Sequence, residues 1–241
     1  MTEPWEYFHT RNILNKYGLP SGTFDSESPW EQAYDIYFMN IRSKRGNSSK
    51  EPLRPNATLK VTAEDNGANR NLGITYSALM DSDTTQIDAL CQKNELTSPI
   101  SWTTTFTNAN EAGKDLVAHT QKGEIRNDRL FLDGKEPSRS ETLGLYTADW
   151  CLFDAVQRLA AQKDKAKHTF DLLEEFSMIR GTQYLCHHGT SEISTDHGAV
   201  TADVYCHYGE SVIPTLYYLD TFFRLFLVVS TRRTVILKGE A

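Results

Sequence analysis

The sequence predicts a mainly β protein of the α+β class. We expect one large curved antiparallel sheet, or open β-barrel, with one main helix packed against its concave face. Three observations predict this fold. Short runs rich in β-branched and aromatic residues recur along the chain, turn signals separate them, and only one long stretch has apolar residues at helical spacing. Strands that follow one another this closely are typical of a meandering antiparallel sheet.

The first half of the chain alternates between apolar and polar residues, as strands with one buried face do. Before these strands comes an arm of residues 1–30, whose aromatic side chains predict that it docks on the body, with a helical turn at 11–16. Residues 43–55 are polar and partly basic, and we expect a flexible, solvated loop there. The strand candidates are 30–41, 57–63, 72–80, 85–93, 100–107, 116–122 and 128–132.

A single stretch in the middle of the chain favours a helix over a strand. Trp150 and Phe153 begin an apolar stripe that continues at helical spacing. We therefore predict a helix over about 147–162, with Thr147 as its N-cap because a threonine hydroxyl can accept from the first free backbone N–H groups. The stripe must be buried, and the concave face of the sheet is the available partner.

The last third of the chain indicates strands and tight turns almost without interruption. A hairpin pairs 181–192 with 199–208 across a turn at Asp196, because Asp and the Gly that follows tolerate positive φ. Pro214 lacks a backbone N–H, so it belongs on an edge strand, at a strand start or at a bulge. The other strand candidates are 168–178, 212–219, 225–230 and 234–237.

Length and charge limit the class of protein. The 241 residues are expected to form a single domain, 1–241, and a net charge of −7 argues against a nucleic-acid binder. No apolar run reaches the roughly 20 residues of a membrane span. The N-terminus lacks the apolar core of a signal peptide, which favours the cytoplasm. A leader removed beforehand would instead favour the periplasm or secretion. Oligomeric state is left open.

Familiar catalytic motifs are missing from the sequence. It contains no Gly-rich phosphate loop, no His-Glu-x-x-His, no Gly-x-Ser-x-Gly and no paired Cys-x-x-Cys. These absences disfavour a nucleotide enzyme, a zincin, an α/β-hydrolase and a zinc ribbon. The sequence predicts no cofactor, apart from one alternative in the hairpin at 181–208.

The hairpin at 181–208 contains several histidine and cysteine residues. The candidate metal ligands are Cys186, His188, Cys206 and His207. A two-residue turn would place Cys186 and His188 beside His207, and a three-residue turn would place them beside Cys206. Either register assembles three ligands that suit zinc or another divalent metal. His188, His207 and Cys186 are also the candidate catalytic residues, because imidazole exchanges protons near neutral pH.

The same residues have simpler alternatives. Cys186 and Cys206 are expected on paired strands, where they could form a cross-strand disulfide or pack as small hydrophobes. The histidines could pack or hydrogen-bond only. The candidate ligand-binding residues are aromatic side chains that would line a hollow, with two arginines that would clamp an anionic head. They are Trp150, Phe153, Tyr184, Tyr205, Tyr217, Arg232 and Arg233.

A likeness to a known architecture rests on the strands of the last third, ending in segment 216–229, LYYLDTFFRLFLVV. This layout resembles the open β-barrel of the LolA/LolB lipoprotein carriers and of relatives such as the violacein enzyme VioE. The resemblance implies an apolar hollow that holds a lipid-like or hydrophobic ligand, in carrier or enzyme form, and it carries no site residues. Carriers of that type are exported, whereas this chain shows no leader.

We therefore expect a protein that binds a hydrophobic or amphipathic small molecule in a β-walled pocket, without catalysis. The alternative is a small-molecule enzyme of isomerase, cyclase or hydrolase type that uses the histidine and cysteine cluster of the hairpin at 181–208, with or without a metal.

Overall fold

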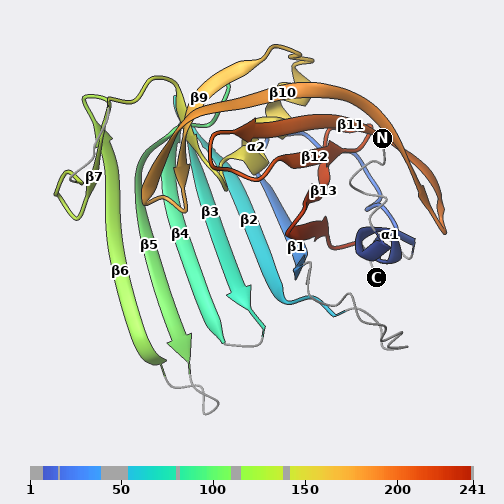
Figure 1. Ribbon diagram of the computed structural model, residues 1–241, viewed down its shortest axis with the longest axis horizontal. Coiled ribbons are helices and arrows are strands. Elements are labelled where there is room, and N and C mark those ends of the chain that lie inside the picture. Colours follow the sequence, from blue (N-terminus) through green and yellow to red (C-terminus); the bar gives the residue numbers. More distant parts are fainter. Residues whose placement is uncertain are drawn as a thin grey trace.

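The computed structural model describes residues 8–15, 17–38, 54–79, 82–109, 115–137 and 142–239, which form one 14-stranded sheet and two helices (Figure 1). The helices are α1 (Phe8–Asn15) and α2 (Leu152–Ala161). The strands are β1 (Trp30–Phe38), β2 (Ala57–Asn66), β3 (Asn69–Ala78), β4 (Asp83–Gln92), β5 (Pro99–Ala109), β6 (Asp115–Arg126), β7 (Arg129–Leu132), β8 (Tyr146–Ala148), β9 (His168–Glu174), β10 (Met178–Thr195), β11 (Gly198–Gly209), β12 (Thr215–Leu219), β13 (Leu225–Ser230) and β14 (Arg233–Leu237).

The sheet is open and has two halves. Its strand order is β7-β6-β5-β4-β3-β2-β1-β14-β13-β12-β11-β10-β9-β8, so β7 and β8 form the two edges. The first and last strands of the sequence, β1 and β14, pair at the centre and join the halves. Neighbours are antiparallel except β8 and β9, which run parallel because α2 lies between them in the chain. Figure 1 shows α2 between the two halves of the curved sheet.

One face of the first half is apolar, as the alternation of its residues predicts. Val61 opposes Ile74 across β2 and β3, Ile74 opposes Ile87 across β3 and β4, and all three side chains are buried. Their sequence neighbours point to the other face and are polar. The apolar face turns toward α2, where Tyr34 of β1 meets Phe153 edge-on with 5.3 Å between ring centroids.

The central strands of the second half are buried on both faces. Every residue of β12 and β13 is buried, which explains their continuous apolar sequences. On one face lies α2, which Tyr217 contacts through Phe153. The opposite face is covered by α1 and the segment after it. Thr10 hydrogen-bonds Thr234 at 2.8 Å, and the ring of Tyr17 stacks on Phe226.

The sequence-based fold is confirmed in class and corrected in its helix. The structure is a mainly β, open curved sheet, and Figure 1 shows its helical content to be small. The helix begins at Leu152, because Thr147 lies in β8 and donates to the Leu96 carbonyl instead of capping a helix. Cys151 is the N-cap and makes no side-chain capping bond. The parallel β8 is also unpredicted, since three residues are too short to show alternation.

Other expectations have mixed outcomes. Pro214 directly precedes β12, the strand-start alternative. Most of the loop at 43–55 lies outside the described residues. Neither helix in the described part of the chain combines the length and apolar character that crossing a membrane requires.

Candidate functional site

Two neighbouring hollows open on the α2 side of the sheet. The first, of about 410 Å³, is mainly apolar, and the second, of about 490 Å³, holds most of the charged side chains and is called the polar hollow. They share Phe38, Glu175 and Arg233 in their walls, so they adjoin one another. Phe38 and Arg233 are direct partners across β1 and β14, which places this junction where the two halves of the sheet meet.

The apolar hollow is built by inward residues of four strands in the first half of the sheet. β1, β3, β4 and β5 each contribute two side chains, two positions apart, because successive strand residues alternate between faces. Trp150, in the turn before α2, completes the wall and lies beside Tyr76. The lining residues are Ile36, Phe38, Ile74, Tyr76, Thr85, Ile87, Thr104, Phe106, Trp150, Glu175 and Arg233.

The polar hollow is lined by the second half of the sheet and by the turns at its end. Its walls are Phe38, Asp149, Leu172, Glu174, Glu175, Arg180, His207, Ser211, Val212, Ile213, Thr215, Tyr217, Ser230, Arg232 and Arg233. Among the acidic and basic side chains, Arg180 and Glu174 neutralise one another at 2.8 Å. The charge that remains comes from Asp149, Glu175 and the two arginines of the β13–β14 turn.

Arg233 stands between the hollows. Its guanidinium lies 5.3 Å from the centre of the Trp150 ring, a cation–π contact. The side chain makes no ion pair or hydrogen bond with any residue that the structure describes. The hydroxyl of Tyr217 likewise has no hydrogen-bond partner among those residues. Two strong donors are therefore free to meet a ligand.

Asp149 lies beside them. Its Oδ1 accepts hydrogen bonds from the backbone N–H groups of Trp150, at 3.0 Å, and Glu175, at 3.3 Å. Burial raises the pKa of Asp149 to about 7, although Arg233 and the two N–H groups act in the opposite direction. Its carboxyl group therefore exchanges a proton near neutral pH.

His207 is the one member of the predicted catalytic set that reaches this site. It faces inward from β11, with its Nε2 atom 3.2 Å from the side-chain oxygen of Gln183. Burial lowers the pKa of His207 to about 4. The imidazole is therefore neutral at physiological pH and is a hydrogen-bonding group there, not a cation.

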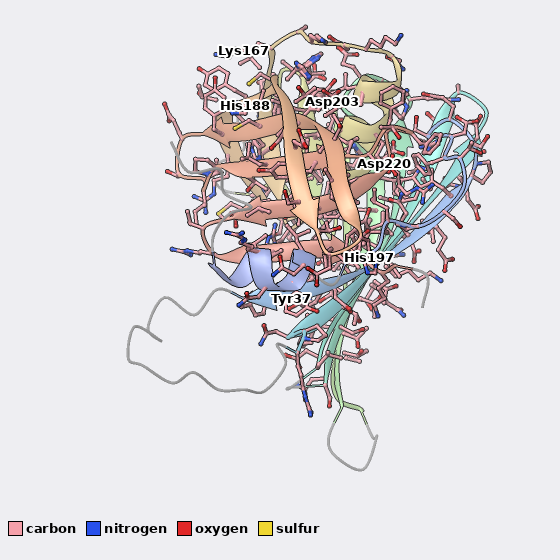
Figure 2. The ribbon with its side chains drawn as sticks, turned by 90° about the vertical axis from the view of Figure 1, so that its right-hand side faces the viewer. Tyr37, Lys167, His188, His197, Asp203 and Asp220 are labelled. Carbon is pink, nitrogen blue, oxygen red and sulfur yellow. The ribbon has the colours of Figure 1, made fainter. Side chains whose placement is uncertain are left out.

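The predicted histidine and cysteine cluster does not assemble as either register required. The turn has two residues, but a β-bulge at His188 shifts the pairing, so Cys186 opposes Cys206. These two cysteines point away from the hollow that His207 faces, and His188 is exposed. Figure 2 shows the hairpin, with His188 and Asp203 on its strands and His197 at its turn. All four cysteines are free, so the cross-strand disulfide is absent.

The same observation bears on the metal alternative, which stays a prediction. Within the described residues, no group of three or more His, Cys, Asp or Glu side chains could hold a metal ion. The bulge leaves His188 exposed, and His207 faces away from the paired Cys186 and Cys206. His187 instead pairs with Asp203, at 2.5 Å.

The predicted ligand-binding residues divide into three groups. Trp150, Tyr217, Arg232 and Arg233 line the hollows. Phe153 and Tyr205 are buried in the core, where the Tyr205 hydroxyl donates to the Asp164 carbonyl at 2.6 Å. Tyr184 lies on the other face, with the Lys167 ammonium group 3.7 Å from its ring centre.

Sequence reasoning missed the apolar wall and Asp149. The inward residues of β3, β4 and β5 were visible as strand alternation, but only the curvature of the sheet brings Ile74, Thr85 and Phe106 around one hollow. Asp149 was assigned to the helix, where its carboxylate would have been an exposed N-terminal charge.

A larger groove, of about 950 Å³, crosses the opposite, polar side of β2–β6. Its outward row includes Thr62, Asp88, Thr103 and Lys122, which oppose one another across successive strands through Gly73. It is broad and solvated, whereas the smaller hollows hold the guanidinium of Arg233 and the hydroxyl of Tyr217. The smaller hollows are therefore the better candidate for a binding site.

Known proteins offer only distant comparisons. No family of known proteins matches the sequence, and no curated protein matches it. Among solved structures, the chain is similar to a β-barrel-like protein of the domain of unknown function DUF1849 from Brucella abortus, with 11% identity, coverage of 88% of this chain and 96% of that chain, and a TM-score of 0.47. It is also similar to a DUF1089 family protein from Pseudomonas aeruginosa, with 7% identity, coverage of 76% and 94%, and a TM-score of 0.42.

Proposed function

We propose that this protein binds a hydrophobic or amphipathic small molecule in the adjoining hollows, without catalysis. The observation that carries this proposal is an apolar wall of strand residues beside a charged hollow with unpartnered donors, since the two hollows share three lining residues. A molecule with an apolar body and a polar head would match both parts. The carrier form that the LolA/LolB resemblance implies is consistent with it.

The dimensions and chemistry of the site support binding. Hollows of about 410 and 490 Å³ fall in the range that small-molecule sites occupy. Aromatic side chains such as Tyr76, Phe106 and Trp150 offer large contact areas, and burying apolar ligand surface contributes roughly 25 cal/mol per Å². The non-catalytic form is supported by the division of the histidine and cysteine set between two faces of the sheet.

A small-molecule enzyme is the second candidate, and one observation favours it. The pKa of Asp149, about 7, suits a general acid or base at neutral pH. In that case Asp149, and not the histidine and cysteine cluster, would move the proton. Isotope exchange into a bound ligand that is lost in Asp149→Asn would favour this candidate over the binder.

Binding can be tested with a simple apolar probe. Decanol is titrated into the full chain by calorimetry, and native mass spectrometry searches for co-purified apolar molecules. Thr85→Trp places a large ring in the apolar hollow, whereas Gln86→Trp places the same ring on the opposite, exposed side of β4. We expect the first variant to weaken decanol binding about tenfold or more and the second to leave it unchanged, since one step of about 1.4 kcal/mol is tenfold.

Two results would overturn the proposal. One is a wild-type chain that neither binds decanol nor carries an apolar molecule. The other is equal weakening by the two tryptophan variants, which would place binding outside the hollow. Circular dichroism of both variants checks that each remains folded.

A further inference from the structure

We propose that the polar end of the ligand is a carboxylate, held by three donors: the guanidinium of Arg233, the hydroxyl of Tyr217 and the protonated carboxyl group of Asp149. The inference rests on the proposed function, since it places the apolar body of the same ligand in the neighbouring hollow. It also makes binding of the carboxylate dependent on pH.

Arg233 supplies the charge, and its position is set by its surroundings. Its backbone N–H donates to the Ser230 hydroxyl at 3.2 Å, which fixes the start of β14. Its guanidinium lies over the Trp150 ring, between the apolar and polar hollows. No described carboxylate pairs with it, so its fork of N–H groups is free for the two oxygens of a ligand carboxylate.

Tyr217 supplies a neutral donor. The residue is buried on β12, and its ring is held edge-on against Phe153 with 6.3 Å between centroids. Burial raises the pKa of the Tyr217 hydroxyl, Arg233 lowers it and Asp149 raises it. Asp149 and Arg233 line the same hollow as this phenol. Because the hydroxyl stays protonated and has no described partner, it can donate to an anion.

Asp149 is a donor only when it is protonated. Its Oδ1 is occupied by two backbone N–H groups, whereas Oδ2 has no hydrogen-bond partner among the described residues. A protonated Oδ2 would donate to a ligand oxygen, and an ionised one would repel it. Burial keeps a substantial protonated fraction at neutral pH, since it raises the pKa of Asp149 to about 7.

The remaining charges leave the polar hollow suited to a single negative charge. The titratable and charged side chains that line it are Asp149, Glu174, Glu175, Arg180, His207, Tyr217, Arg232 and Arg233. Glu174 and Arg180 pair with each other, and His207 is neutral. While Asp149 is protonated, the two positive charges of Arg232 and Arg233 exceed the single negative charge of Glu175, so the hollow has a net positive charge. A carboxylate restores neutrality, whereas a dianionic phosphate would exceed it.

The test compares ligands that share one apolar chain. Decanoate, decanol, decyl phosphate and decyltrimethylammonium are titrated into the full chain by calorimetry at about pH 6 and about pH 8. We expect decanoate to bind at least about tenfold more tightly than decanol and decyltrimethylammonium at about pH 6, and more tightly than decyl phosphate at about pH 8, where that phosphate is mainly a dianion. Its affinity should fall by up to about tenfold per pH unit above the pKa of Asp149, whereas decanol binding should not change.

Variants separate the three donors. Arg233→Gln should reduce decanoate binding at least about tenfold, to the level at which the same variant binds decanol. Tyr217→Phe should weaken decanoate about fivefold to tenfold, as loss of one hydrogen bond to a charged group does. Asp149→Asn keeps a donor at the same place, so it should bind decanoate equally at both pH values. Arg129→Gln, on exposed β7, is the matched control and should have no effect.

The outcomes distinguish this inference from the proposed function. The carboxylate site is overturned, and the binding proposal stands, if decanol binds in the hollow and decanoate binds no more tightly than decanol. The same conclusion follows if decanoate binding by Asp149→Asn still depends on pH. Tighter binding of decyl phosphate overturns it too. If none of the chains binds, both proposals fail together.

Discussion

The Nε atom of Arg70 in β3 donates to Oδ1 of Asp154 in α2 at 2.8 Å, and neither side chain is exposed. The other carboxylate oxygen of Asp154 accepts from the Thr97 hydroxyl at 2.8 Å, and Arg70 also donates to the Ser26 carbonyl. This buried pair ties the helix to the sheet. It therefore holds the turn before α2, which carries Trp150 and Asp149 into the candidate site.

Removing one partner of this pair should be costly. Burial raises the pKa of Asp154 although Arg70 lowers it, so a lone Asp154 would lose its charge or leave it unpaired in the core. We expect Arg70→Met to lower the free energy of unfolding by about 3–5 kcal/mol in urea denaturation. The double variant Arg70→Met with Asp154→Leu should lose less than the single one.

Lys60→Met is the matched control for that prediction. Lys60 pairs with Glu31 at 2.9 Å, but both side chains are about half exposed. Such a pair contributes about 0–1 kcal/mol. Equal losses for Arg70→Met and Lys60→Met would show that the buried pair does not anchor α2.

Asp149 should make the protein less stable as pH rises. Its folded pKa, about 7, lies above the ordinary value of 3.8, so the folded state binds the extra proton between these pH values. Stability contributed by this group is present below about pH 4 and is lost as pH rises to about 7. Because Asp149 is partly exposed, we expect Asp149→Asn to stabilise the chain by about 2–4 kcal/mol at about pH 8, measured by urea denaturation. An unchanged or lower stability would contradict the raised pKa.

His207 should act in the opposite direction. Its folded pKa, about 4, lies below the ordinary 6.5, so the unfolded chain binds the proton first as pH falls. Stability is therefore lost between about pH 6.5 and about pH 4, by at most about 3 kcal/mol. His207→Gln should remove this acid sensitivity, and Asp149→Asn should expose it by removing the opposing titration. Identical pH profiles for both variants and the wild type would rule out these two assignments.

The fold could be predicted because its strands carry one apolar face each. Apolar and polar residues alternate along these strands, so each inward residue, such as Val61, Ile74 or Ile87, lies two positions from the next. This alternation predicts the strands from the sequence. The helix start could not be placed in the same way. The apolar stripe continues backwards through Trp150, and nothing local shows that Asp149 belongs to a turn.

The candidate site depended on a register that sequence left open. The bulge at His188 turns Cys186 toward Cys206 and separates both from His207. The sequence contained one sign of this bulge, because an isolated glycine in a strand, here Gly189, often marks one. In the structure Gly189 has a φ of +122°. The unpartnered state of Arg233 and Tyr217 had no such signal, because it arises from contacts between distant strands.

Gly123 allows the close packing of Trp102 across β5 and β6. The two residues oppose each other, and a Cβ atom at Gly123 would lie 2.0 Å from the Trp102 ring. Gly123→Ala should therefore displace the ring and cost about 1–3 kcal/mol of stability in urea denaturation. Gly144→Ala meets no atom within 4 Å and should change stability little. Similar losses in both variants would mean that backbone flexibility, and not the ring, explains the glycine.

Arg224 holds the segment after α1 against the second half of the sheet. Its guanidinium donates to the Pro20 carbonyl at 3.1 Å and to the Gly22 carbonyl at 2.6 Å, and it lies 5.9 Å from the centre of the Phe24 ring. The turn that presents it is fixed by Asp220, whose Oδ1 accepts from the Arg224 backbone N–H at 2.9 Å. One side chain therefore joins the N-terminal segment to the β12–β13 turn.

Arg224→Ala should release this segment without unfolding the sheet. Charged hydrogen bonds contribute roughly 1.5–3 kcal/mol each, so the segment's local opening should become at least about tenfold more frequent. Limited proteolysis with subtilisin, followed by mass spectrometry, would detect faster cleavage between residues 17 and 29. Arg129→Ala, which removes only an exposed ion pair with Glu136, should cleave there at the wild-type rate. Equal cleavage rates in all three chains would show that contacts untouched by either change hold the segment, among them the Tyr17–Phe226 stacking and the bond from Arg70 to the Ser26 carbonyl.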